Sequence, residues 1–327
     1  EANAPVVERL NTKVLPTFYV LDPATEAPRL AHPGSLTAAE LVALVTPLEA
    51  LGAARTADGG SSAVATADRI NHLADTKDFA GCVREGAAAA PGMSPGTPRA
   101  DVLRAALGCA NGLRELPAPP DTADTRAQVE ALVTAGERAL ADPSDPILAD
   151  DRSDLYDYVV DALDRQGRKD DARRLAESWV AFLEQRAASA PSPSARAVFD
   201  AHRLLAYEAV GEPARAVPML EASARDFPDD YNPPARLGRA YLDLKRYDDA
   251  IAAIERAIGL AYGPRKLRLW SLEADAEQAK GDAAGARRTI GTAVAFAKTI
   301  PLTGGYPKLA ASLEDRLASM DAGPPSR

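Results

Sequence analysis

The sequence has few of the residues that carry metal or redox chemistry. Its 327 residues include only two cysteines, Cys82 and Cys109, without a CxxC motif, and three scattered histidines, His32, His72 and His202. Zinc sites use close pairs of Cys and His ligands, and thiol–disulfide exchange needs a reactive dithiol. We therefore expect no metal site and no cofactor, and this chain contains no dithiol motif for redox catalysis.

Excess positive charge and long apolar runs are also missing. The chain has 38 Lys and Arg against 47 Asp and Glu, a formal net charge of −9. This balance disfavours a nucleic-acid partner, because neutralising phosphates needs a basic surface. No run of about 18 apolar residues exists, so the sequence predicts no membrane span. Aromatic residues are scarce at 5%, which favours helices packed through small side chains over a β core.

A helical pattern is clearest between Pro234 and Tyr262. Apolar or small residues recur there at steps of three and four, which is the spacing of helix faces rather than of a strand. A polar turn at 245–249 divides the stretch into two helices. Small residues stand where antiparallel helices must approach closely, at Gly238, Ala250 and Ala257.

The same pattern recurs on both sides of this stretch. A backward shift of 34 residues places small, bulky, terminal Pro and aromatic residues in the same positions: Ala216, Leu220, Pro228 and Tyr207. A forward shift of 36 residues finds the second-helix residues Ala286, Ile290 and Ala293. In that forward repeat, Glu273, Ala274 and Glu277 replace the Leu-Gly-Tyr residues of the first helix.

These positions resemble the tetratricopeptide repeat, whose first helix carries Leu-Gly and Tyr and whose second carries Ala, a bulky residue and Ala. The family's first-helix Trp is not matched, because Pro234 stands there. The resemblance implies a mainly α fold, a solenoid of antiparallel helix pairs, since one unit cannot bury its own apolar face. The alternative is chance similarity among Ala-rich helices.

We expect the helical array to cover 62–327, after a flexible linker at 52–61. Helices are predicted at 63–73, 77–90, 99–116 and 121–141, and a longer pair at 154–166 and 170–185 departs from the regular period. The last helix, 306–320, has a polar outer face that suits a cap.

Residues 1–51 have a different pattern. Two strands are predicted at 13–22 and 28–32, followed by an amphipathic helix that a capping box of Thr37 and Glu40 would start. The sequence VLPTFYVLDP, then Gly34, then LTAAEL, resembles the C-terminal half of a thioredoxin-like domain. That resemblance implies a cis peptide bond before Pro16 and a backbone at Leu15 that pairs with an extended substrate.

The half of a thioredoxin-like domain that carries CxxC is absent from this sequence. Without it, the hairpin would expose Phe18 and Val20. We expect the chain to be a fragment whose upstream half is not included; the alternative is that hairpin and helix dock on the helical array. An ordinary edge strand that begins with Pro is a further alternative.

The resemblance to tetratricopeptide proteins also implies a binding surface on the inner face of the first helices. It carries over to Asn232, Ala235, Arg239 and Leu242, and one repeat earlier to Ala201, Leu205 and Glu208. Asn232 and Arg239 match only in part the residues that grip a terminal carboxylate in the peptide-clamp subfamily. A generic protein or peptide partner is therefore expected rather than a carboxylate clamp.

Other candidate sites have simpler explanations. Cys82 and Cys109 are predicted on neighbouring helices and could form a disulfide, or could pack as two small buried residues. The acidic residues between Asp150 and Asp157 fit helix starts and solvated turns, and the order of a calcium loop is missing. His202 fits a partly buried histidine, because no nucleophile motif accompanies it.

The sequence thus favours a protein-interaction scaffold of the thioredoxin-like tetratricopeptide type, resembling bacterial proteins, with any disulfide exchange dependent on cysteines outside this chain. A plain repeat scaffold without a redox role is the alternative. An enzyme is a weaker third, since no catalytic constellation is found. We expect an extracytoplasmic location, periplasmic or secreted, with the cytoplasm as the alternative, and the oligomeric state stays open.

Overall fold

The computed structural model describes residues 9–10, 17–26, 28–33, 36, 38–52, 62–118, 122–302 and 305–322. The chain divides into two compact units, Glu1–Ser189 and Ala190–Arg327, and each is described by itself. We call them unit 1 and unit 2. The sequence predicts a different division, with a first segment at 1–51 and a linker at 52–61. That division rests on sequence pattern and composition, and it stays a prediction.

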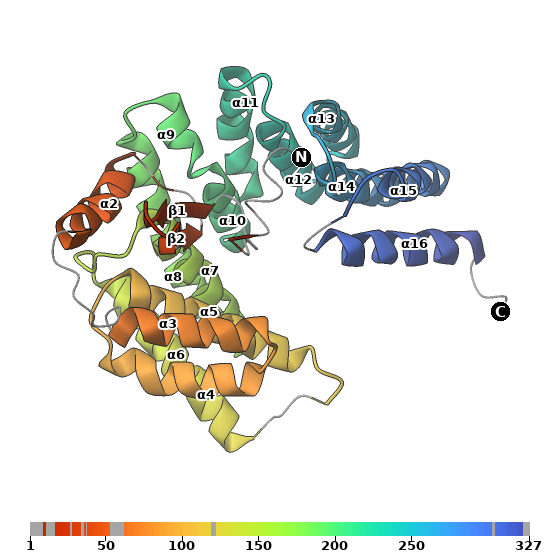
Figure 1. Ribbon diagram of the computed structural model, residues 1–327. Helices are drawn as coiled ribbons and strands as arrows, with labels where there is room; N and C mark the ends of the chain where they lie inside the picture. The colour runs from red at the N-terminus through yellow and green to blue at the C-terminus, as the bar shows by residue number, and fades with distance from the viewer. Residues whose placement is uncertain are drawn as a thin grey trace. The chain divides into compact units, whose positions relative to one another are not determined.

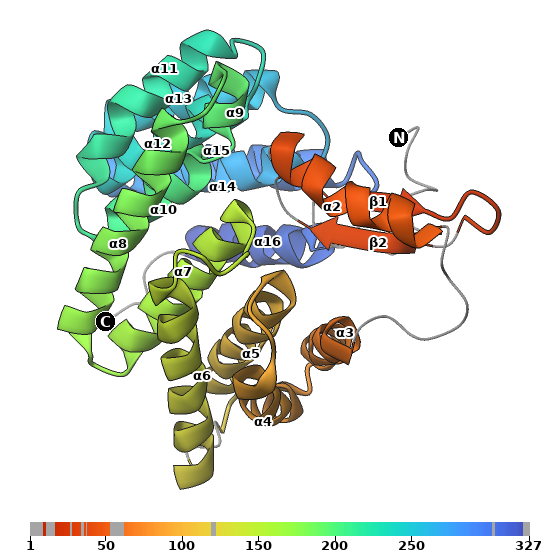
Figure 2. The same ribbon diagram turned by 90° about the vertical axis from the view of Figure 1, so that its left-hand side faces the viewer.

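Unit 1 begins with a β-hairpin. Strands β1 (Thr17–Leu21) and β2 (Pro28–Pro33) pair antiparallel, with Phe18 opposite His32, and lie side by side in Figure 2. Asp22 holds the turn, because its Oδ1 accepts the amide protons of Ala24 and Thr25. Helix α2 (Ala38–Gly52) follows. The predicted order of strand, turn, strand and helix is therefore present among the described residues.

Six helices make up the rest of the described part of unit 1 and form consecutive hairpins (Figure 1). They are α3 (Ser62–Asp75), α4 (Phe79–Ala89), α5 (Thr97–Arg114), α6 (Ala123–Ala141), α7 (Ala149–Arg165) and α8 (Lys169–Ala188), with a short 3-10 turn η1 (Ala90–Gly92) after α4. Several predicted boundaries were wrong by two residues or more. Helix α4 starts at Phe79 because Asp78 caps it, and α7 starts five residues before the predicted Asp154.

Glycine allows two of these helix pairs to approach closely. A β-carbon at Gly86 of α4 would overlap the side chain of Ala106 on α5, and one at Gly136 of α6 would overlap Val159 on α7. Side chains of any other residue would push these helices apart.

One buried arginine fixes the loop between α6 and α7. Arg152, on α7, donates to the carbonyl oxygens of Leu140 at 3.3 Å, Asp142 at 3.0 Å and Asp145 at 2.9 Å. It thereby satisfies carbonyl groups at the C-terminal end of α6 that have no partner within the helix. The Asp145 carboxylate in turn pairs with Arg99 of α5.

Unit 2 consists of helical hairpins that follow the predicted period. Its helices are α9 (Pro193–Ala197), α10 (Asp200–Ala209), α11 (Ala216–Asp226), α12 (Asn232–Asp243), α13 (Tyr247–Leu260), α14 (Arg265–Lys280), α15 (Ala283–Ala297) and α16 (Tyr306–Ala322), with a 3-10 turn η2 (Pro213–Arg215). Figure 1 shows α13 to α16 lying next to one another in chain order.

Equivalent positions of the three repeats have equivalent environments. Ala216, Ala250 and Ala286 are all fully buried, as are Leu220, Ile254 and Ile290. Tyr207 and Tyr241 are both buried, and an arginine from the turn before the second helix stacks on each ring: Arg215 at 4.7 Å and Arg246 at 4.4 Å from the centroid. The sequence prediction of repeated helical hairpins is confirmed in this unit.

The C-terminal helix covers the last repeat. Leu313 of α16 is buried against α15 residues such as Ala293, and Trp270 of α14 meets Phe296 of α15 edge to face at 5.1 Å. The predicted polar outer face is present: Glu314 and Asp315 are exposed, and Glu314 pairs with Lys298. Helix α16 therefore ends the array as a cap.

Candidate functional site

The groove residues predicted from the repeat lie on two neighbouring helices of unit 2, α10 and α12. Arg239 of α12 connects them, because its guanidinium lies 3.5 Å from Glu208 of α10 and 3.2 Å from Asp243 on its own helix. Leu205 of α10 is an exposed large apolar residue, with 38% of its surface accessible. Ala201, Ala235 and Leu242 are half-buried on the same helices.

Asn232 is not placed to bind a ligand. It is the first residue of α12, and its backbone and side-chain nitrogens both donate to Oδ1 of Asp230 at 2.8 Å. Its amide group is thus occupied in forming the start of the helix. This geometry supplies no carboxylate clamp at Asn232, and leaves Leu205, Glu208 and Arg239 as the mixed apolar and charged surface of the site.

The degenerate third repeat buries an acid where the repeat before it buries a leucine. Glu273 stands at the position of Leu237 and is 8% exposed. Burial, with Glu277 and Glu255 nearby, raises the pKa of Glu273 to about 7. Trp270 of this repeat stands where Pro234 stands in the one before. The shift of 36 residues would have revealed it as the first-helix aromatic residue of the family, a signal that the sequence reading missed.

A second buried acid joins α10 to α11. Asp200 occupies the position equivalent to Pro234, and Ser223 the position equivalent to Ala257; the Ser223 hydroxyl donates to Asp200 Oδ2 at 2.5 Å. Burial raises the pKa of Asp200, whereas this hydrogen bond and the nearby Arg236 lower it. Asp200 and Ser223 thus replace the Pro and Ala of the next repeat, and they form a hydrogen bond with each other.

Unit 1 holds a larger polar cluster. Asp101 and Arg104 of α5 pair at 3.3 Å, next to Asp151 of α7, which is 5% exposed; β2 places His32, also 5% exposed, against the same group. Desolvation and the neighbouring Asp101 raise the pKa of Asp151 to about 8, and desolvation lowers the pKa of His32. Asp151 lies in the first turn of α7, so the predicted helix start is confirmed. The predicted solvation is wrong at this residue, because Asp151 is buried beside α5.

The side chain of Glu40, on α2, reaches the N-terminal end of α7. Its Oε1 accepts the amide proton of Ala149, the first residue of α7, at 2.9 Å and lies 4.0 Å from Arg186 of α8. The residue before Ala149, Leu148, offers no capping side chain, so Glu40 acts as the cap from a distant segment. Among the described residues, however, no group of His, Cys, Asp and Glu is arranged to hold a metal ion.

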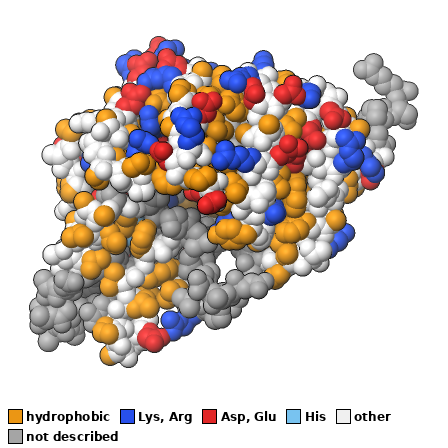
Figure 3. Space-filling model, turned by 90° about the horizontal axis from the view of Figure 1, so that it is seen from above, with side chains coloured by type: hydrophobic (Ala, Val, Ile, Leu, Met, Phe, Trp, Pro, Cys, Tyr) orange, Lys and Arg blue, Asp and Glu red, His pale blue; other side chains and the backbone are white. Residues whose placement is uncertain are grey.

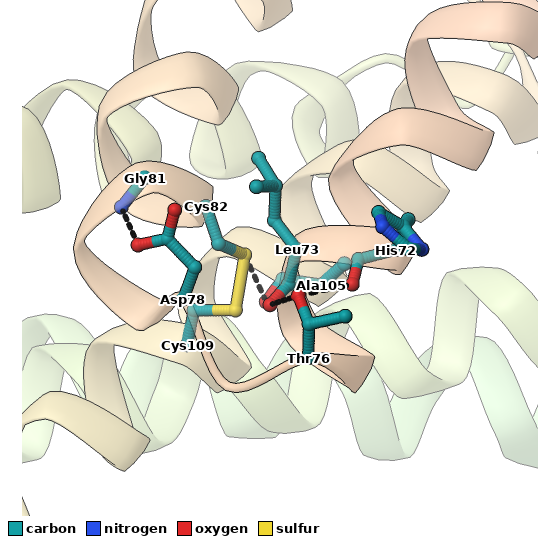
Figure 4. Close-up of a disulfide and its surroundings, with 8 residues drawn as sticks. All are labelled: His72, Leu73, Thr76, Asp78, Gly81, Cys82, Ala105 and Cys109. Carbon is teal, nitrogen blue, oxygen red and sulfur yellow. Dashed lines mark hydrogen bonds between the residues drawn. A yellow bond between two sulfur atoms is a disulfide. The ribbon is translucent and has the colours of Figure 1, made fainter.

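The structure has a disulfide between Cys82 of α4 and Cys109 of α5 (Figure 4). Their Cα atoms are 6.2 Å apart and both residues are buried. Cys82 Sγ lies 3.7 Å from the carbonyl oxygen of Ala105. Since a bonded sulfur has no proton to donate, this is a packing contact in the disulfide form. The bridge links the facing sides of one helix pair.

Leu15 and Pro16, the predicted substrate-pairing residues, lie outside the described residues. His202 is half-buried on α10. Figure 3 shows one face of the protein, on which basic and acidic side chains lie close together rather than in separate regions.

Comparison with known proteins agrees with the repeats of unit 2. The family model of the tetratricopeptide repeat matches residues 208–261. This match spans the second half of the α10–α11 pair and the whole of α12–α13. These residues contain tetratricopeptide repeats, as the sequence predicted. A search of curated proteins finds no relative of the chain.

Similar solved structures are repeat proteins. One is a tetratricopeptide protein of Thermus thermophilus (19% identity, 61% of this chain and 93% of that chain covered, TM-score 0.36). Another is BtubC from P. vanneervenii (14%, 82% and 93%, TM-score 0.40). A third is the TPR2AB domain of yeast Sti1 in complex with pHSP90 (14%, 80% and 100%, TM-score 0.34). These identities and scores support no conclusion about a partner. No helix in the described ranges is long and apolar enough to cross a bilayer.

Proposed function

We propose that the protein is an interaction scaffold whose unit 2 binds a segment of a partner protein across α10 and α12. The observation that carries the proposal is the surface of Leu205, Glu208 and Arg239, which combines an exposed apolar side chain with a charged pair on adjacent repeats. Stacked helical repeats build extended concave surfaces, and repeat proteins use these surfaces for binding.

A matched pair of leucine variants tests this proposal. Leu205→Asp places a charge in the α10 surface, while Leu116→Asp makes the same change at a leucine of unit 1 that is 40% exposed. We expect Leu205→Asp to reduce recovery of co-purified partner in a quantitative pull-down at least about fivefold and Leu116→Asp to leave it unchanged. If Leu205→Asp and Leu116→Asp recovered the same amount of partner, that result would count against binding at α10 and α12. Unchanged recovery with the Asn232→Ala/Arg239→Ala variant would count against it as well.

We also propose that residues 1–51 are the second half of a thioredoxin-like domain, with redox cysteines supplied by sequence outside this chain. The order of β1, turn, β2 and α2 supports this reading. The alternative is a plain scaffold in which the hairpin docks on the array, and the contact of Glu40 with Ala149 favours it. Reading the encoded residues upstream of Glu1 separates them, since a CxxC at a helix start would support the first and its absence the second.

The location that we propose is extracytoplasmic. The Cys82–Cys109 disulfide supports it, because disulfides persist in oxidising compartments and are rare in the cytosol. Fractionation of cells that express the natural gene would place the protein, and recovery in the cytoplasmic fraction with reduced cysteines would contradict the proposal.

A further inference from the structure

Two adjoining hollows lie along α6 in unit 1. One hollow of about 690 Å³ lies between the end of α5, the start of α6 and the turn before α8. A second, of about 550 Å³, continues along α6 beside η1. Ala127 and Glu130 line both hollows, so the two are parts of one groove. Each hollow has the size of a site for a few amino-acid side chains.

Small residues form the floor of the groove. Ala127, Ala131 and Ala135 follow one another at steps of four, so they lie along the same side of α6. Ala127 and Ala131 are exposed and Ala135 is half-buried. A ligand backbone can therefore come close to the helix without displacing a large side chain.

The walls of the groove carry almost only positive charge. Among the described residues that line it there is one carboxylate, Glu130, and no lysine. The lining includes six arginines: Arg99, Arg114, Arg126, Arg138, Arg165 and Arg168. Several of these guanidinium groups are paired with carboxylates, so the positive charge available to a ligand comes from those that are not.

Two of these arginines form no ion pair among the residues that the structure describes. Arg165 is held by Asp161 at 2.8 Å, Arg168 by Asp171 at 2.8 Å, and Arg99 by Asp145. Within the described ranges, by contrast, exposed Arg114 and Arg138 form no ion pair. They line different hollows, so the uncompensated charge extends along the whole groove.

We propose that this groove binds an acidic protein segment, in which Asp or Glu side chains meet the arginines and small or apolar residues lie on the alanine floor. Guanidinium groups bind carboxylates with two parallel hydrogen bonds, which suits them to such a segment. A long polyanion such as a nucleic acid, or an anionic membrane, meets the negative field of the whole chain, whereas a short segment meets mainly the groove. The inference goes beyond the function proposed for unit 2.

Fluorescence anisotropy with the purified full chain tests the proposal. The probe is a labelled twelve-residue peptide that alternates Glu with Ala and Leu, and the control probe has Lys in place of each Glu. We expect saturable binding of the Glu peptide, at least about tenfold weaker at 0.5 M salt, and none of the Lys peptide. Absence of binding at low salt, or equal binding of both peptides, would overturn the proposal. So would tighter binding of a twelve-nucleotide single strand, a phosphoserine peptide or phosphatidylserine vesicles.

Variants show whether the groove itself is the site. Arg114→Ala/Arg138→Ala should weaken binding at least about tenfold, because the loss of each exposed charge should weaken it about threefold. Ala131→Phe should also weaken it by filling the floor without changing charge. The matched control, Arg225→Ala/Lys308→Ala, removes two exposed charges from unit 2 that have no ion pair within the described ranges, and should change binding less than twofold.

Equal weakening by this control and by Arg114→Ala/Arg138→Ala would reduce the effect to net charge and overturn the proposal, as would full binding by Ala131→Phe. Circular dichroism establishes that each variant is folded. Leu205→Asp should bind the Glu peptide as the wild type does, so the outcome is independent of the function proposed for unit 2.

Discussion

Units 1 and 2 are both built from helical hairpins, but different interactions hold the hairpins together. In unit 2 the same small and bulky residues recur at each repeat, so each hairpin is fixed by apolar packing on its neighbours. Unit 1 also has a large apolar core, in which Leu103, Leu132 and Leu155 are fully buried, but its repeat is irregular. Single contacts add to this core: a disulfide, the Arg152 hydrogen bonds, and the polar cluster around Asp101. Unlike the repeated packing of unit 2, each of these contacts depends on one or two residues.

The largest effect that we expect comes from Arg152→Met. The substitution keeps the apolar stem but removes three hydrogen bonds to the carbonyl oxygens of Leu140, Asp142 and Asp145, so unit 1 should lose about 3 kcal/mol of stability. Two of these oxygens keep a backbone donor, the amide of Asp145 or of Ile147. Urea unfolding, monitored through the hydrogen exchange of backbone amides in each unit, measures this loss. Arg173→Met, which breaks only an exposed ion pair with Glu177, should cost less than about 0.5 kcal/mol. A similar cost for both would contradict the role assigned to Arg152.

The disulfide should have the next largest effect. Cys82→Ala/Cys109→Ala opens a loop between residues 27 positions apart, and the chain-entropy model gives a loss of about 3 kcal/mol, less where native packing persists. Protection of α4 and α5 amides from hydrogen exchange should fall, while that of α12 and α13 should not change. If exchange rose equally in both units, the bridge would not be a local feature of unit 1.

Buried acids give each unit its own pH dependence. Asp151 and Glu273 have folded-state pKa values of about 8 and about 7, above their ordinary values of 3.8 and 4.5. The folded protein holds these protons more tightly, so each contribution to stability is complete at low pH and is lost as pH rises, toward about 8 in unit 1 and about 7 in unit 2.

Neutral isosteres test these two pH dependences separately. Asp151→Asn should stabilise unit 1 at pH 8.5, and Glu273→Gln should stabilise unit 2, each by roughly 1 to 2 kcal/mol relative to the wild type. At pH 4 neither variant should be more stable. Unfolding across pH 4 to 9, followed by Trp179 for unit 1 and Trp270 for unit 2, measures both effects. If a variant kept the wild-type change of unfolding free energy with pH, another titrating group would be responsible for that change.

The smallest effect on stability should come from the proposed binding surface. Arg239→Ala removes ion pairs with Glu208 and Asp243, but the Arg239 side chain is half-exposed, so we expect less than about 0.5 kcal/mol. A midpoint shift in thermal unfolding beyond that would indicate that the pair is structural. Little change in stability together with loss of partner recovery would mark the residue as part of a binding surface.

The repeats could be predicted because their pattern is local and recurs. Gly238 and Ile254 show the reason: a β-carbon at Gly238 would overlap Ile254, so the close approach of α12 and α13 demands a small residue at that place. Ala274 stands there in the next repeat, whereas Leu204 stands there in the one before. The Trp270 position was equally accessible at a shift of 36 residues but was missed, because the Leu-Gly-Tyr residues around it are replaced.

The polar clusters could not be predicted in the same way. His32 and Asp101 come from a hairpin and a helix far apart in the chain, and Glu40 caps a helix that begins more than a hundred residues later. Asp151 has the same sequence context as Asp150 and Asp154, which are half-buried. Its burial beside α5, together with the nearby Asp101, raises its pKa.

By itself, the sequence determined the helical-hairpin architecture, the repeat period and the residues at the close approaches, since these follow from spacing and side-chain size. The tertiary structure decided which charged residues are buried and which are exposed, how Cys82 and Cys109 meet, and how six arginines from distant helices line one groove. Burial and charge proximity depend on distances between segments, and no local spacing encodes them.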